Sequence, residues 1–173
     1  MKKITIIFFL FSFALNAQTR ETITQNRADF VGVKTKNDFK QEPYVKWFDD
    51  SYNDYTLDQK AIKKIKKHLN GVTIKVFMAV WCHDSHREVP RLYKILAAAD
   101  FDENNLEVIA LNRAKKTPNN IQNGFEITHT PTFIFYKNGK ELARYIEKSN
   151  ELLEKDILKI ISGKPYKHFY DKS

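Results

Sequence analysis

Apolar residues change their spacing along the chain, and each change predicts a different kind of element. Over residues 56–69 they recur every three or four positions, which predicts a helix opened by a capping box at Thr56 and Gln59. Residues 72–80 are almost wholly apolar and rich in β-branched side chains, which favours a buried central strand. Helical spacing returns over residues 85–99, so a helix is expected to follow that strand directly.

The remaining pattern alternates in the same way. Strands are expected over residues 28–35 and 106–111, a short helix over 117–124 with Pro118 in its first turn, a hairpin of 132–136 and 141–146 around Asn138-Gly139, and a last helix over 150–162. Strands that alternate with helices and end in a hairpin predict an α/β domain. Its central mixed β-sheet would be flanked by helices on both faces.

The first residues of the chain have the pattern of an export signal. Lys2 and Lys3 precede an apolar run over residues 4–15, and Ala17 is a small residue suited to cleavage. The run falls short of the ~20 residues that a membrane-spanning helix needs. We therefore predict a cleavable signal peptide over residues 1–17, an exported mature protein without a membrane span, and a periplasmic location if the cell has two membranes. An uncleaved membrane anchor is the alternative.

The rest of the chain divides by composition into three parts. Residues 18–55 form a predicted N-terminal extension, polar at first and then rich in charge and aromatic rings. Residues 56–163 hold the clear strands and helices of the predicted domain, and residues 164–173 are a C-terminal tail.

Charge and cysteine content narrow the function classes. The 173 residues carry a formal net charge of +8, and removal of Lys2 and Lys3 with the signal leaves 8 − 2, or +6. Basic residues gather at 60–67 and 113–116, which we interpret as solvated surface, because no aromatic-interleaved nucleic-acid motif accompanies them. With one cysteine, an intramolecular disulfide is impossible. No nucleotide loop or hydrolase triad stands out, and we expect no cofactor.

The only cysteine, Cys82, stands where the predicted central strand gives way to a helix, in the sequence Trp81-Cys82-His83-Asp84-Ser85. Free N–H groups and the positive dipole at a helix N-terminus favour a thiolate over a thiol. Cysteines outside disulfides are most often buried and inert. The polar residues around Cys82 argue against burial, so the sequence points to a reactive thiol.

At these residues the chain resembles the thioredoxin family. Trp81-Cys82-x-x-Ser85 is similar to its Trp-Cys-x-x-Cys turn, and Pro90 stands where the family has a helix proline. Thr130-Pro131-Thr132 resembles the loop whose cis-proline lies beside the reactive sulfur. The resemblance covers residues 57–162 and implies a thioredoxin-like fold and thiol-disulfide exchange, as an oxidoreductase or isomerase.

Two departures from the family pattern shape the expected chemistry. Ser85 replaces the second cysteine, so a mixed disulfide at Cys82 would need an external thiol to resolve it. Val76 stands where many thioredoxins carry a buried acid. The resemblance implies Cys82 as nucleophile, Ser85 as a hydrogen-bond donor to its sulfur and Trp81 as a shield. Thr130 and Pro131 would orient the substrate, which is a protein or small-molecule disulfide.

Two other functions remain open at this level. Cys82 and His86 are four residues apart on one helical face, and His129 lies near Pro131, so the three residues suit Cu(I) or Zn(II) in a metal carrier. The same fold, retired from catalysis, could instead serve as a binding module through the aromatic residues of its extension and tail.

Overall fold

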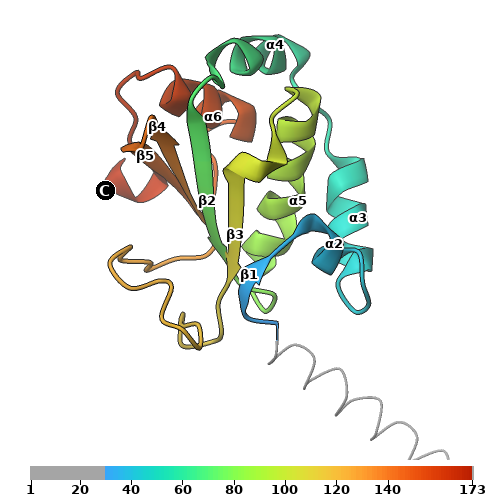
Figure 1. Ribbon diagram of the computed structural model, residues 1–173. Helices are drawn as coiled ribbons and strands as arrows, with labels where there is room; N and C mark the ends of the chain where they lie inside the picture. The colour runs from blue at the N-terminus through green and yellow to red at the C-terminus, as the bar shows by residue number, and fades with distance from the viewer. Residues whose placement is uncertain (1–29, 173) are drawn as a thin grey trace, which may run out of the picture. The chain divides into compact units, whose positions relative to one another are not determined.

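The computed structural model describes residues 30–172 (Figure 1). The chain divides into two units, residues 1–30 and 31–173, and the described helices and strands belong to the second. The predicted signal peptide over residues 1–17 therefore lies outside the described residues, and so does the first part of the predicted extension.

One five-stranded sheet organises the second unit. Its order is β1-β3-β2-β4-β5, and the strands are β1 (Gly32–Lys34), β2 (Val72–Met78), β3 (Leu106–Ala110), β4 (Thr132–Lys137) and β5 (Lys140–Ile146). β2 and β3 are parallel, and the other neighbouring pairs are antiparallel. The predicted mixed sheet is confirmed.

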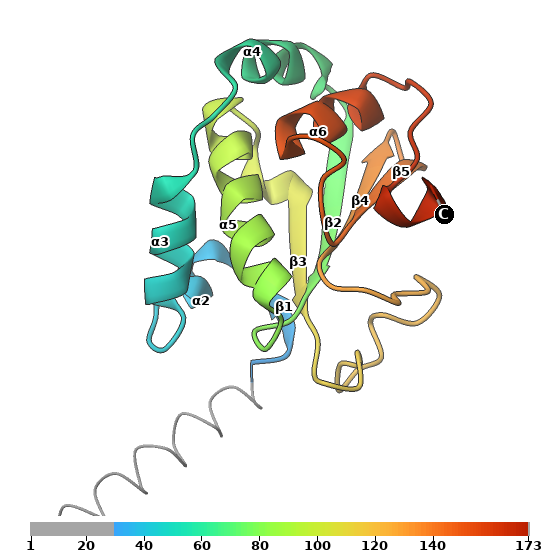
Figure 2. The same ribbon diagram turned by 180° about the vertical axis from the view of Figure 1, so that it is seen from behind.

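Helices flank this sheet. They are α2 (Lys36–Phe39), α3 (Val45–Asp54), α4 (Gln59–His68), α5 (His83–Ala98) and α6 (Leu153–Ile161), with short 3-10 turns η1 (Glu103–Asn105) and η2 (Phe169–Lys172). Figure 2 shows α5 and α6 in front of the sheet, with α3 on the outer side of α5. The last three residues of β2, Val76, Phe77 and Met78, are all fully buried, as expected of a central strand covered on both faces.

A loop, not a helix, follows β3. Phe77, Ile109 and Ile134 form a buried cluster against which Ile121 and Phe125 of this loop pack. The loop also contains the segment for which the sequence predicts a short helix.

That predicted helix over residues 117–124 is wrong, because the segment consists of turns. Side chains take over the backbone hydrogen bonds there. Thr117 Oγ1 accepts from the Ile121 N–H, and Gln122 Oε1 accepts from the Thr117 N–H, both at 2.9 Å. Asn120 also adopts a φ of 52°, in the left-handed region, which interrupts a right-handed helix.

The predicted start of the helix over residues 56–69 is also corrected. Its N-cap is Asp58, whose carboxylate accepts from the N–H groups of Lys60 and Ala61, so Thr56 lies before the helix. Asp ranks above Thr as an N-cap, which favours the later start. The predicted hairpin is confirmed, with positive φ at Asn138 (51°) and Gly139 (79°), as a type I′ turn requires.

Residues of the predicted extension form ordered elements of the same unit. β1 pairs with β3 at the edge of the sheet, and α3 packs on α5. Phe39 and Phe48 are fully buried and stack with ring centroids 5.5 Å apart, and both contact Tyr93 of α5. The boundary placed at residue 55 stays a prediction.

Candidate active site

Cys82 occupies the junction between β2 and α5. It is the N-cap residue of α5, with extended backbone angles (φ −97°, ψ 120°), and its free thiol is half-buried. Its N–H donates to the Ala79 carbonyl at 3.0 Å, while its own carbonyl accepts from the His86 N–H at 3.1 Å. The first turn of the helix thus holds the thiol with unpaired helical N–H groups nearby.

The loop before β4 lies directly against this sulfur. Cys82 Sγ donates to the Thr130 carbonyl oxygen at 3.0 Å, and the Thr130–Pro131 peptide bond is cis. Two further bonds fix the loop: Glu147 N–H donates to the Pro131 carbonyl, and Thr132 Oγ1 donates to the His129 carbonyl, both at 2.8 Å. The structure brings together Cys82, Thr130 and Pro131, which the sequence assigned to one site.

Ser85 is fully buried in the first turn of α5. Its Oγ accepts from the Ala79 N–H at 3.2 Å, which ties the helix to the end of β2. The recorded hydrogen bond of Ser85 therefore supports the backbone of the turn, whereas the sequence assigned its hydroxyl to the sulfur of Cys82.

Trp81 is half-buried beside the cysteine and has a cationic neighbour. The guanidinium carbon of Arg113 lies 5.6 Å from the centre of its ring. Its Nε1 is buried with no hydrogen-bond partner among residues 30–172. Sequence reasoning placed Arg113 in a solvated basic run and missed this contact, since only the parallel pairing of β2 and β3 brings the two loops together.

The histidines of the metal-carrier alternative are engaged elsewhere. His86 Nε2 lies 2.7 Å from the Val80 carbonyl, and its ring stacks on Trp47 at 4.2 Å. The ring of His129 stacks on Tyr170 at 4.4 Å. Within residues 30–172 no group of three His, Cys, Asp or Glu residues is placed to hold a metal ion. The structure thus does not assemble Cys82, His86 and His129 into a metal site.

A charged network on α5 was not predicted. Glu88 is 3% exposed, and its Oε1 accepts from Arg87 Nε at 2.5 Å and from Arg91 at 3.3 Å. Arg87 also pairs with Asp84 at 2.6 Å. Glu88 Oε2 is buried without a hydrogen-bond partner in the described chain. Spacings of three residues between opposite charges in the sequence could have indicated this network.

Val76 stands at the position where many thioredoxins have a buried acid, so β2 carries no acid there. The buried acid near Cys82 is Glu88 of α5, and its charge acts on the hydroxyl of Tyr145. Val76 is fully buried in β2. Burial, together with the charge of Glu88, raises the pKa of the Tyr145 hydroxyl. Near the cysteine, the buried carboxyl group of Glu88 is therefore on the helix that follows Cys82, and the strand that precedes Cys82 has the apolar Val76 at the family's acid position.

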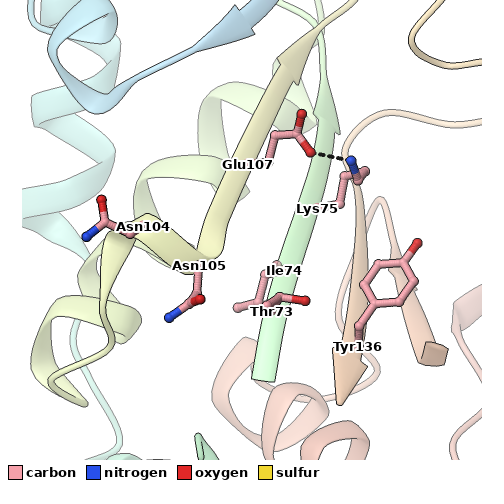
Figure 3. Close-up of a pocket in the computed structure, with 7 residues that line it drawn as sticks. All are labelled: Thr73, Ile74, Lys75, Asn104, Asn105, Glu107 and Tyr136. Carbon is pink, nitrogen blue, oxygen red and sulfur yellow. Dashed lines mark hydrogen bonds and ion pairs between the residues drawn. The ribbon is translucent and has the colours of Figure 1, made fainter. Parts of the chain in front are cut away.

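A cavity of about 270 Å³ lies away from the cysteine, where β2 and β3 begin (Figure 3). Figure 3 shows Lys75 and Glu107 paired across the neighbouring strands, with Tyr136 of β4 beside them. Since Cys82 follows the other end of β2, this cavity is separate from the candidate active site.

Comparison with known proteins agrees with this arrangement. A family model described as "Thioredoxin" matches residues 33–159, so the chain belongs to the thioredoxin family. This membership supports a redox role in thiol-disulfide chemistry at the level of the family. The match also includes β1, α2 and α3, within the predicted extension. No curated protein matches the chain.

One of the solved structures similar to this chain shares its fold at low sequence identity, and others match a shorter part of the chain. A protein of unknown function from Pseudomonas aeruginosa is 13% identical, with a TM-score of 0.56 over 79% of this chain and 95% of its own. Thioredoxin from Fasciola hepatica is 20% identical, with a TM-score of 0.39 over 57% of this chain and 88% of its own. Mitochondrial thioredoxin 3 from Saccharomyces cerevisiae is 25% identical, with a TM-score of 0.34 over 56% and 86%.

The length and apolar character of the helices bear on whether any of them could cross a membrane. Among residues 30–172, no helix combines the length and the apolar character that crossing a membrane requires.

Proposed function

We propose that the mature chain is an exported monothiol oxidoreductase or isomerase that exchanges thiols and disulfides through Cys82. One observation carries the proposal: the half-buried thiol caps α5 and lies 3.0 Å from the Thr130 carbonyl, next to the cis peptide bond at Pro131. A family fold that retains its nucleophile in this position supports chemistry at the sulfur.

The exchange proceeds by thiolate attack. Cys82 Sγ loses its proton and attacks one sulfur of a substrate disulfide; a new S–S bond forms, the old one breaks, and the second substrate sulfur leaves as a thiolate. Electrons are conserved in this step, and Cys82 ends in a mixed disulfide. In the free protein the Thr130 carbonyl accepts a hydrogen bond from the Cys82 thiol. Because the sulfur has no proton in the mixed disulfide, this carbonyl can then accept from a backbone N–H of the substrate.

Turnover then requires a thiol from outside the chain, because Ser85 cannot attack a disulfide. If a third cysteine thiol of the substrate attacks the substrate sulfur of the mixed disulfide, a new substrate disulfide forms, Cys82 leaves as a thiolate, and the result is isomerisation. If external thiols attack, two of them are oxidised to a disulfide for each substrate disulfide reduced. Ser85 holds the turn through Ala79 in either case.

The test is to trap the mixed disulfide and then restore the second cysteine. Purified residues 18–173 are incubated with glutathione disulfide, and intact mass is measured. We expect one glutathione adduct per chain, none in Cys82→Ser, and slow reduction of insulin above the Cys82→Ser blank when dithiothreitol supplies the external thiol. Ser85→Cys is expected to lose two hydrogens on oxidation and to accelerate insulin reduction.

Failure of the adduct to form would contradict the proposal, and binding partners captured equally by wild type and Cys82→Ser would favour a retired binding module instead. Export is tested by fractionation of cells that express the full chain. A mature N-terminus at Gln18 in the exported fraction is expected, whereas a chain retained with residues 1–17 would contradict that part.

A further inference from the structure

The loop that follows β3 carries a run of positive charge, Arg113-Ala114-Lys115-Lys116. Arg113 and Lys116 are exposed, and Lys115 is half-buried. In the described chain, no carboxylate forms an ion pair with any of these three cations. We call Arg113, Lys115 and Lys116 the basic loop.

Hydrogen bonds close the basic loop into a tight turn. Lys116 N–H donates to Asn112 Oδ1, and Lys115 N–H donates to the Asn112 carbonyl, both at 2.9 Å. Asn112 N–H in turn donates to the Lys116 carbonyl at 3.1 Å. Lys115 has a φ of 56°, which turns the chain back on itself. The backbone under the three cations is therefore held in one conformation.

Sheet topology places the basic loop beside Cys82. β2 and β3 are parallel, with Met78 paired to Ala110, so the chain leaves both strands at the same edge of the sheet. One exit leads to Cys82 and the other to the basic loop; Figure 1 shows the segment after β3 leaving the sheet at the end where α5 starts. Arg113 lies over the ring of Trp81, the residue that precedes Cys82. This contact joins the basic loop to the turn that carries the cysteine.

Acidic groups near the cysteine do not offset this charge. Asp84 pairs with Arg87, and Glu88 is buried and bonded to Arg87 as well. Glu147, beside the Pro131 loop, accepts the hydroxyl of Tyr170. The two carboxylates on the first turns of α5, Asp84 and Glu88, are thus paired with arginine, whereas Lys115 and Lys116 form no ion pair in the described part of the chain and can meet a ligand.

We propose that the basic loop selects the substrate of Cys82: an acidic polypeptide segment that carries the disulfide, with carboxylates flanking its half-cystine. This inference rests on the proposed exchange reaction and names its substrate class. The three cations stand on an exposed turn, so they suit several carboxylates spread along an extended chain. Complementary charge of this kind acts mainly on the rate of encounter and weakens with salt.

The test compares peptides that differ only in charge. Three synthetic peptides carry one cysteine as its 2-pyridyl disulfide, flanked by Glu, Gln or Lys, and release of pyridine-2-thione measures the rate with residues 18–173. We expect the Glu peptide to react about tenfold faster than the Lys peptide at low salt, with the Gln peptide between them. The difference should shrink toward unity as ionic strength rises.

Two matched variants locate the effect. Arg113→Gln/Lys115→Gln/Lys116→Gln should lose most of the preference for the Glu peptide. Lys60→Gln/Lys63→Gln/Lys64→Gln, which removes equal charge from the exposed face of α4, should keep it. Figure 1 shows α4 at the opposite end of β2 from the basic loop. The salt dependence of the wild type tests the same idea without any variant that must fold.

The outcomes separate the two proposals. Equal rates for the three peptides, all above the Cys82→Ser blank, would overturn the substrate class and leave the exchange reaction standing. Rates no higher than that blank would overturn both. Dependence on the basic loop with glutathione disulfide but not with the Glu peptide would mean a small anionic disulfide, which also overturns the polypeptide assignment.

Discussion

The junction between α4 and α6 and the edge that holds Cys82 use polar residues in opposite ways. At the junction, Glu154 is fully buried, and both of its oxygens accept hydrogen bonds, from the Tyr55 hydroxyl at 2.6 Å and the Asp58 N–H at 3.1 Å. At the Cys82 edge, Trp81 Nε1 lacks a partner in the described chain, and Arg113 covers an aromatic ring.

The difference suggests a division of labour within one small unit. A buried carboxylate whose two oxygens both accept hydrogen bonds specifies how two helices meet, because a shift would leave a desolvated charge with fewer partners. Exposed cations without an ion pair in the described chain, such as Lys116, add little to stability and are able to meet a ligand. Changes at the junction should therefore alter stability alone, and changes at the edge should alter reactivity alone.

The largest expected effect comes from the edge. Cys82→Ser should abolish glutathione adducts completely, because no other thiol exists in the chain. Its midpoint of thermal unfolding should stay within a few degrees of the wild type, since the thiol is half-buried and makes one weak S–H bond. Mass spectrometry and thermal denaturation on one preparation measure both. A large drop in the midpoint of thermal unfolding would contradict the idea that changes at the Cys82 edge alter reactivity alone.

At the junction, Glu154→Ala should lower the free energy of unfolding by about 2–4 kcal/mol. The substitution leaves the Tyr55 hydroxyl and the Asp58 N–H without their acceptor and opens a cavity. Urea denaturation measures the loss. The rate of Cys82 alkylation by iodoacetamide in native buffer should not change, and a several-fold change in that rate would show that the two regions are coupled.

Gly71→Ala is expected to cost about 1–2 kcal/mol. Gly71 connects α4 to β2 with a φ of 72°, and an added Cβ would meet the side chain of Asn138 in the hairpin. Asn138→Gly in the same background removes the clashing side chain and tolerates the φ of 51° at this position, so it should recover the steric part of the loss while leaving the conformational part. Recovery of all of it, seen by urea denaturation, would mean that backbone strain contributes nothing at this turn.

Sequence reasoning succeeded where the signal was local. The spacing of apolar residues defined β2 and α5, and Asn138-Gly139 defined the hairpin, because each signal resides in a few adjacent residues. Trp81-Cys82-x-x-Ser85 and Thr130-Pro131 were found as motifs, and the fold joined them. The burial of Glu88 and the contact of Arg113 with Trp81 depend on packing between segments distant in sequence, which periodicity does not reveal.

The errors have the same origin. Pro118 favoured a helix over residues 117–124, but side-chain bonds from Thr117 and Gln122 satisfied the backbone in a turn instead. For α4, Thr56 and Gln59 matched a capping box, yet Asp58 was equally able to cap. Local sequence patterns indicate which structures a segment is able to form. Tertiary packing and side-chain hydrogen bonds decide which of these structures the segment adopts.

The smallest effect concerns a carboxylate that caps a helix outside both regions. Asp38 accepts from the Thr35 N–H at 2.7 Å and from the Thr35 hydroxyl at 2.8 Å, and these bonds hold its pKa below the ordinary value. A lowered pKa in the folded state contributes stability above the unfolded value of about 3.9 and loses it as pH falls through the folded value. Asp38→Asn should therefore cost about 0.5–1 kcal/mol at pH 7 and progressively less below pH ~4. Urea denaturation across this pH range measures both. A cost at pH 7 as large as that of Glu154→Ala would contradict the idea that burial, and not the hydrogen bonds alone, makes the α4–α6 junction the stabilising region.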